Sequence, residues 1–256
     1  MKKFLLLTAA LLVGKMLPAQ DTALTSGKII FTEKVKLQIK LEGDAAGMAD
    51  ALPTENVMEK VLLFTSTETS YEENKSAPAD VEPEEESGVK VKFIMSGSSK
   101  TYTDLVRKII LDQRDFMNRI FLVTKPFPET AWKMTGNQKD ILGYKCIEAV
   151  STDSTGRKTI VWFTPDIKIS GGPASYCNLP GMVLGVNINE GDRTIIAKSI
   201  EKVDASDLKI EKPKEGKKVS DAEFKKIMSE KMKEMGMEEG GTQGGAAHVK
   251  IVIKRQ

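Results

Sequence analysis

The stretch KIIFTEKVKLQIKLEG, residues 28–43, indicates the class of fold because its side chains alternate between apolar and polar. Val35, Leu37, Ile39 and Leu41 are separated by lysine or glutamine, so an extended chain here has one apolar and one polar face. This period of two predicts a strand in an antiparallel sheet that is buried on one side.

Other segments of strand length repeat this pattern along the chain. They lie at residues 58–73, 89–96, 100–113, 118–125, 144–152, 157–165, 181–189 and 193–204. The connections at 153–156 (DSTG) and 189–192 (NEGD) are short and rich in turn residues, which predicts hairpins. Parallel pairing needs long crossovers that such turns cannot supply, so a mainly β, antiparallel fold is expected.

The N-terminal residues 1–20 have the three parts of a secretory signal peptide. Lys2 and Lys3 precede an apolar run at 4–13, and a small-residue exit follows near Ala19. No cysteine follows this exit, which argues against a lipid anchor, and no later stretch approaches the roughly 20 apolar residues of a membrane span. The expected location is outside the cytoplasm: periplasmic, associated with the outer membrane, or secreted.

The composition predicts one β domain at residues 21–204, a charged linker at 205–219 and a C-terminal part at 220–256. The last part contains a predicted helix, a glycine-rich connector at 240–247 and a final strand at 248–256. Ser220 and Glu223 have the spacing of a capping box at the start of the helix. The amphipathic stripe of that helix comprises Phe224, Ile227, Met228, Lys231, Met232 and Met235.

Charge and residue types exclude several kinds of function. The chain has 38 Lys and Arg against 36 Asp and Glu, so its net charge of +2 does not indicate a nucleic-acid partner. His248 is the single histidine, which leaves no basis for a serine–histidine triad or a histidine zinc site. The carboxylates form no recognisable pair for glycoside hydrolysis. We therefore expect no cofactor and a protein that is not an enzyme.

Cys146 and Cys177 are the two cysteines of the chain. An even pair in an exported protein predicts a structural disulfide. The alternative is two buried free thiols that never meet.

The stretch GGPASYCNLPGMVLGV, residues 171–186, has the spacing of neither a phosphate-binding loop nor a nucleophile elbow. We expect a structural corner in which Gly171 and Gly172 adopt positive φ, and Pro180–Gly181 occupies the centre of a type II turn. The residues of this structural motif are Gly172, Pro173, Asn178, Leu179, Pro180 and Gly181.

Several motifs in a fixed order resemble the GLPGLI family of exported Bacteroidetes proteins. They are Trp132, Gly143-Tyr144-Lys145-Cys146, Ala149, Gly156-Arg157, Trp162-Phe163-Thr164, Ile169, Gly172-Pro173 and Leu179-Pro180-Gly181. The resemblance covers roughly residues 27–204, and the chain departs from the namesake motif at Asn178 and at Met182–Val183. It implies an exported β fold, either a curved antiparallel sheet or an open barrel-like sandwich with the C-terminal helix added, and no established activity.

Two hypotheses for the function remain open. The first is a non-enzymatic envelope protein that binds or carries a hydrophobic ligand on an exposed apolar face, or that assists an outer-membrane transport receptor. The second is a metal-handling accessory protein for copper(I). Its candidate ligands are Met228, Met232, Met235, Met237 and His248. The same methionines also fit a core-facing helix stripe, because Phe224 and Ile227 continue it.

Overall fold

A computed structural model describes residues 24–40, 53–75, 97–234 and 247–250, with backbone alone at 38–40, 97–99 and 247–250. The predicted signal peptide and the predicted strand at 89–96 lie outside the described residues. So do Met235, Met237 and the end of the predicted C-terminal strand.

The described residues form thirteen strands, one 3-10 helix and one α-helix. In chain order they are β1 Gly27–Lys40, β2 Glu55–Phe64, β3 Glu68–Glu73, β4 Gly97–Asp104, β5 Ile109–Phe116, β6 Arg119–Pro126, β7 Lys133–Ile141, β8 Tyr144–Thr152, β9 Lys158–Thr164, β10 Met182–Ile188, η3 Asn189–Gly191, β11 Arg193–Lys202, β12 Lys217–Ser220, α1 Asp221–Glu234 and β13 Ala247–Lys250.

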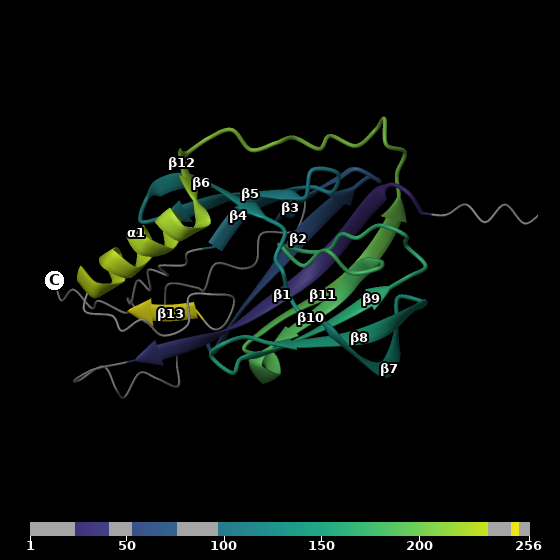
Figure 1. Cartoon of the computed structure of the whole chain (residues 1–256), viewed down its shortest axis with the longest axis horizontal. Helices are drawn as coiled ribbons and strands as arrows, with labels where there is room; N and C mark the ends of the chain where they lie inside the picture. The colour runs from purple at the N-terminus through teal and green to yellow at the C-terminus, as the bar shows by residue number, and fades with distance from the viewer. Residues whose placement is uncertain (1–23, 41–52, 76–96, 235–246, 251–256) are drawn as a thin grey trace, which may run out of the picture.

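One sheet contains all these strands, in the order β12-β6-β5-β4-β3-β2-β1-β11-β10-β9-β8-β7, and β13 pairs with β1 beside this path. Neighbours are antiparallel except for β12 with β6 and β13 with β1. Figure 1 shows β7 at one end of the sheet, and β12 with α1 at the other. The ends do not meet, so the sheet is open. The predicted mainly β, antiparallel fold with a C-terminal helix is confirmed.

The strand boundaries differ from the expectation in four places. Residues 58–73, predicted as one strand, form parts of two strands, and the chain reverses between them at Thr65–Thr67. Residues 100–113 likewise belong to two strands, and the chain reverses between them through Lys108, whose φ is +55°. Strand β7 was missed because eight of its nine residues are exposed, so it has no apolar alternation. Strand β12 begins in the predicted linker and ends one residue after it. Whether residues 21–204 fold as an independent domain remains a prediction.

The face of the sheet that carries the buried positions of β1 is called the inner face here. Its β1 residues are Ile29, Phe31, Glu33, Val35 and Leu37, whereas Lys34 and Lys36 are exposed. Directly paired residues on neighbouring strands share a face. The inner face therefore continues through a row of paired residues across the sheet. This row is Ile29, Leu62, Tyr71, Thr101, Asp112, Val123 and Val219.

Residues 165–181, the inner-face loop, cover the middle of this face. The loop buries Ile167, Ile169 and Leu179 in the same core as Phe31 and Leu62. Backbone hydrogen bonds join it to the start of β10, where the Met182 amide donates to Ile167 and the Val183 amide to Gly171. The predicted exposed apolar face is therefore wrong, because the chain's own loop occupies it.

The glycines of this loop are needed for close packing rather than for positive φ. A Cβ on Gly172 would lie 2.4 Å from the Tyr176 carbonyl oxygen, and neither Gly171 nor Gly172 has a positive φ. The type II turn is also not formed. The Gly181 amide donates to the Leu179 carbonyl, a three-residue turn about Pro180, and Gly181 has a φ of +153°. Asn178, at φ +68°, adopts the left-handed conformation instead.

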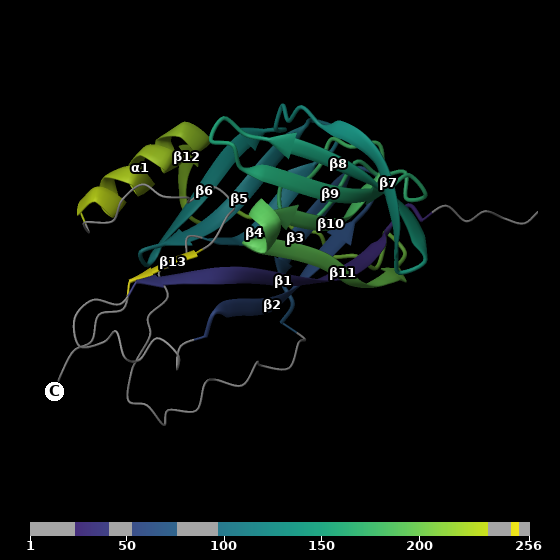
Figure 2. The same cartoon turned by 90° about the horizontal axis from the view of Figure 1, so that it is seen from below.

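Helix α1 covers the other part of the inner face, beside β12 and β6 (Figure 2). Phe224, Met228 and Met232 are buried against Phe116, Phe121, Val123 and Val219, as the sequence stripe predicted. The Phe224 ring meets the Phe121 ring edge to face at 5.3 Å. The capping box is formed: the Ser220 amide donates to Glu223 at 2.7 Å, and the Glu223 amide donates to Ser220 Oγ at 3.2 Å.

Candidate functional site

The most polar part of the inner face is a cluster of Glu33, Tyr71, Tyr176 and Arg193, called the inner-face polar cluster. Arg193 lies opposite Val35 on the neighbouring strand and is therefore a diagonal neighbour of Glu33. Its Nη2 contacts Glu33 Oε1 at 2.6 Å, and Tyr71 Oη donates to Glu33 Oε2 at 3.0 Å. The Glu33 side chain is 6% exposed, so this is a buried ion pair.

Tyr176, on the inner-face loop, is counted with the cluster because the charges of two of its members act on it. Its ring is half-buried, and the charges of Arg193 and Glu33 both act on its phenol. Burial raises the pKa of Tyr176, and burial together with the Glu33 charge raises that of Tyr71 well above its ordinary value. For Arg193, burial alone lowers the pKa, but the Glu33 carboxylate outweighs it and the pKa is raised. At neutral pH the cluster thus has two protonated phenols and a guanidinium paired with a carboxylate.

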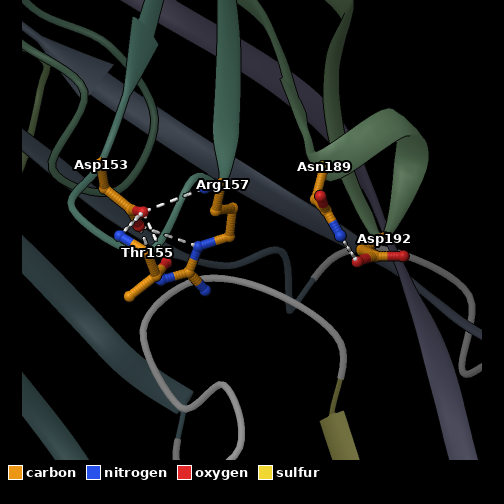
Figure 3. Close-up of polar contacts among 5 residues, drawn as sticks. All are labelled: Asp153, Thr155, Arg157, Asn189 and Asp192. Atoms are coloured by element: carbon orange, nitrogen blue, oxygen red, sulfur yellow. Dashed lines mark hydrogen bonds and ion pairs between the residues drawn. The ribbon is translucent and has the colours of Figure 1, made fainter.

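Figure 3 shows the turn between β8 and β9. Asp153 Oδ1 accepts from the Thr155 amide at 2.9 Å and from Thr155 Oγ1 at 2.5 Å, while Oδ2 accepts from Arg157 Nε and Nη2, both at 3.1 Å. These bonds, led by that from the Thr155 hydroxyl, lower the pKa of Asp153 to about 2. Arg157 is thereby held in one orientation, and its charge also acts on Tyr176.

The second turn in Figure 3 joins β10 to β11. Asn189, Glu190 and Gly191 all have positive φ, and the Asn189 side chain donates to the Asp192 carboxylate. Thr159 at the start of β9 pairs with Ile188 at the end of β10, so the two turns lie at the same end of the sheet. Both sequence-predicted hairpins are confirmed here.

A second buried charge lies on the inner face nearer α1. Asp112 Oδ2 accepts from Lys125 at 2.6 Å and from Arg114 at 3.0 Å, while its Oδ1 has no hydrogen-bond partner. Burial raises the pKa of Asp112, but Lys125 and Arg114 outweigh burial and the pKa is lowered. The Arg114 guanidinium also lies 5.2 Å from the centre of the Phe224 ring. This group joins the sheet to the helix.

The predicted disulfide is not formed, because Cys146 and Cys177 are buried free thiols. They lie in different surroundings: Cys146 is influenced by Lys139, Asp140 and Asp166, and Cys177 by Lys125. The alternative of two separate buried thiols is therefore the one the structure contains.

Neither thiol is expected to react with dithiobis(nitrobenzoate) in the folded protein at pH 8, and both are expected to react after unfolding in guanidinium. Burial raises the pKa of Cys146 to about 11 and that of Cys177 to about 12. The thiolate, which is the reactive form, is then roughly 0.1% or less of either group at pH 8. Protein unfolded without reductant that shows no free thiol would mean that the disulfide exists.

The proposed metal ligands do not come together as a site in the described residues. Met228 and Met232 are packed in the apolar core of α1, and the side chain of His248 on β13 is not described. The described parts of the chain also contain no group of three or more His, Cys, Asp or Glu side chains that could hold a metal ion. No helix within them is long and apolar enough to cross a membrane.

The sequence prediction missed the inner-face polar cluster, although one signal for it is present. Glu33 occupies the apolar phase of β1, between Phe31 and Val35. A carboxylate at a core-facing position needs a cationic or hydrogen-bonding partner, because an unpaired buried charge is strongly unfavourable. The sequence could have indicated that Glu33 has a partner, but not that the partner is Arg193.

Comparison with known proteins gives one family match, over residues 120–226, to the model described as "N-glycanase peptide, N-terminal domain". This is less than half of the chain. No curated protein matches the chain significantly.

Two solved structures share the fold. The structure of PNGF-II in space group P21 has a TM-score of 0.54 at 17% identity, covering 79% of this chain and 33% of that one. The structure of PNGF-II in space group C2 has a TM-score of 0.52 at 17% identity, covering 79% and 32%. At this identity the likeness shows the fold alone, and the chain spans about a third of the PNGF-II length.

These findings correct three expectations from the sequence. The match to the N-glycanase N-terminal domain contradicts the GLPGLI resemblance. It also contradicts the function as a hydrophobic-ligand carrier, receptor assistant or copper accessory. The expectation that the protein is not an enzyme is contradicted as well, because the matched domain belongs to an enzyme by its description. The short turn motifs that supported the resemblance define local geometry, which unrelated β proteins can share.

Proposed function

We propose that this protein acts on N-glycosylated polypeptides, and that its β sheet is the part that holds the glycosylated chain. The observation that carries the proposal is the match of residues 120–226 to the N-glycanase N-terminal domain. The matched residues include the β8–β9 and β10–β11 turns, and two members of the inner-face polar cluster, Tyr176 and Arg193.

The chemistry of that end of the sheet supports recognition of sugars. Saccharides present many hydroxyl and carbonyl oxygens, which accept hydrogen bonds from guanidinium and phenol groups. Arg157, Arg193 and Tyr176 supply such donors from fixed positions, because Asp153 and Glu33 hold the two guanidinium groups. A rigid donor set loses little conformational entropy when a ligand binds.

We also propose that the protein is exported, on the strength of residues 1–20. N-glycosylation acceptor sites are features of secreted proteins, so export would bring the protein to its substrates. Expression of the full chain in a bacterial host, followed by N-terminal sequencing of the mature protein, tests this. Cleavage close to Ala19 or Gln20 is the expected result, and an intact N-terminus in the cytoplasmic fraction would refute it.

The function is tested with one glycoprotein that carries a single N-glycan, and with the same protein after the glycan has been removed. The purified full-length protein is immobilised, and binding of both forms is measured by interferometry. In parallel, the intact mass of the glycoprotein is followed during incubation. Preferential binding of the glycosylated form, or loss of the glycan mass, supports the proposal. Equal binding of the two forms with no change in mass refutes it.

A further inference from the structure

We infer that Thr101, Asp112 and Arg114 form a binding site for an uncharged saccharide on the inner face, beside α1. The inference rests on the proposed function and specifies where the sugar binds and which of its groups are recognised. Thr101 on β4 lies directly opposite Asp112 on β5, and Arg114 is two residues further along β5, so the three share one face. Their next neighbours across the sheet belong to two different apolar clusters, Tyr71 to the core under the inner-face loop and Val123 to the core under α1. The site is thus the polar strip between these two cores.

Contacts from the sheet and from the helix hold the two charged members of the site. Asp112 Oδ2 contacts Lys125 Nζ at 2.6 Å and Arg114 Nη2 at 3.0 Å. The Arg114 guanidinium also lies 5.2 Å from the centre of the Phe224 ring on α1. Because both side chains are already fixed, a ligand that binds them causes little further loss of conformational entropy.

Each of the three residues has one buried polar atom without a hydrogen-bond partner. These atoms are Thr101 Oγ1, Asp112 Oδ1 and Arg114 Nε. Thr101 and Asp112 are 1% and 2% exposed. Against the effect of burial, the Thr101 hydroxyl joins the two cations in lowering the pKa of Asp112, so it lies near the carboxylate without hydrogen-bond geometry. Buried polar atoms are ordinarily paired in folded proteins, so a bound group is expected to complete the set.

The unpaired atoms favour a ligand that both donates and accepts hydrogen bonds. Asp112 Oδ1 can only accept, Arg114 Nε can only donate, and the Thr101 hydroxyl can do either. A sugar hydroxyl or acetamido group offers a donor and an acceptor close together. The carboxylate of an acidic sugar offers acceptors alone, and it would face the like charge of Asp112. The chemistry therefore indicates an uncharged saccharide.

The two cations of the site connect it to solvent. The side chains of Lys125 and Arg114 are 16% and 20% exposed, against 3% for the Asp112 side chain that they contact. A ligand therefore approaches along these two long side chains, and it reaches Asp112 Oδ1 and Thr101 when one of them turns aside. Movement of Arg114 changes its contact with Phe224. Binding is thus expected to alter the amide hydrogen exchange of α1.

The test uses the full-length protein and two probes, neutral diacetylchitobiose and anionic sialyllactose, titrated and followed by NMR. Thr101→Val removes the hydroxyl, keeps the shape of the side chain and breaks no hydrogen bond of the described chain. Ser70→Ala is the matched control. Ser70 Oγ is also buried without a partner, but Ser70 precedes Tyr71 on β3 and so lies on the opposite face of the sheet. Guanidinium-induced unfolding of the three proteins checks that neither substitution lowers stability.

The expected result is binding of chitobiose that weakens about 3–10-fold in Thr101→Val and is unchanged in Ser70→Ala. Amide hydrogen exchange of α1, followed by mass spectrometry, should change when chitobiose binds the wild type, and unchanged exchange would overturn the coupling to the helix. Tighter binding of sialyllactose than of chitobiose would overturn the preference for an uncharged ligand.

Two further outcomes separate this site from the proposed function. No binding of chitobiose, or equal affinity of the three proteins, would overturn the site and assign the unpaired atoms to ordered water only. If the glycoprotein is still bound preferentially or loses its glycan, the proposed function stands without this site. If the glycoprotein is neither bound nor altered, the proposed function itself fails.

Discussion

Arg193→Met is expected to lower the free energy of unfolding by about 3–5 kcal/mol, because it leaves the Glu33 carboxylate buried without its cation. The Glu33 side chain is 6% exposed and receives one further hydrogen bond, from Tyr71. Methionine has a length similar to that of arginine, so it can fill the space but cannot compensate the charge. Guanidinium-induced unfolding followed by circular dichroism measures the change.

Lys28→Met is the control for this prediction. Lys28 pairs with Glu201 at 2.7 Å on the same pair of strands, β1 and β11, but their side chains are 39% and 59% exposed. A pair in contact with water contributes about 1 kcal/mol or less, so this variant should unfold close to the wild type. Similar losses in both variants would contradict the claim that burial of Glu33 makes its pair important.

Gly181→Ala is the second substitution with a large expected effect, and it should lower the free energy of unfolding by about 2–6 kcal/mol. A Cβ at this position would lie 2.1 Å from the Thr164 carbonyl oxygen, which belongs to the backbone and cannot rotate away. The forced shift costs about 1–3 kcal/mol. The φ of +153°, which side chains other than glycine rarely adopt, adds about 1–3 kcal/mol.

Gly136→Ala separates these two contributions. Gly136 on β7 also has a positive φ, +83°, but a Cβ there would meet nothing within 4 Å. The Gly136→Ala variant should therefore lose only the free energy that an alanine costs at a positive φ, about 1–2 kcal/mol. Thermal melting of both variants gives the comparison. If Gly181→Ala melts at or above the temperature of Gly136→Ala, the close approach of the inner-face loop to β9 is not as the structure has it.

Local patterns were sufficient for several features of this protein. Alternation from Val35 through Leu37 predicted that β1 is a strand with one buried face, because each side chain points opposite to its neighbours, and both residues are buried. The hairpins at 153–156 and 189–192 follow from their turn residues, and the start of α1 follows from Ser220 and Glu223. All these depend on residues within a few positions of one another.

Contacts between distant residues decided the rest. Sequence alternation does not say which loop covers the inner face. Residues 165–181 do so because Ile167, Ile169 and Leu179 pack in the same core as Phe31 and Leu62. Likewise, Cys146 and Cys177 stay apart because their segments pack in different surroundings.

The candidate site shows most clearly which features follow from local sequence and which depend on contacts between distant residues. The position of Glu33 in the buried phase of a strand follows from the sequence, since successive side chains of a strand point to opposite faces. Only the folded chain shows that the partners of Glu33 are Tyr71 and Arg193. The physical reason is that strand order and register set which side chains meet across the sheet, and these depend on the packing of the whole chain.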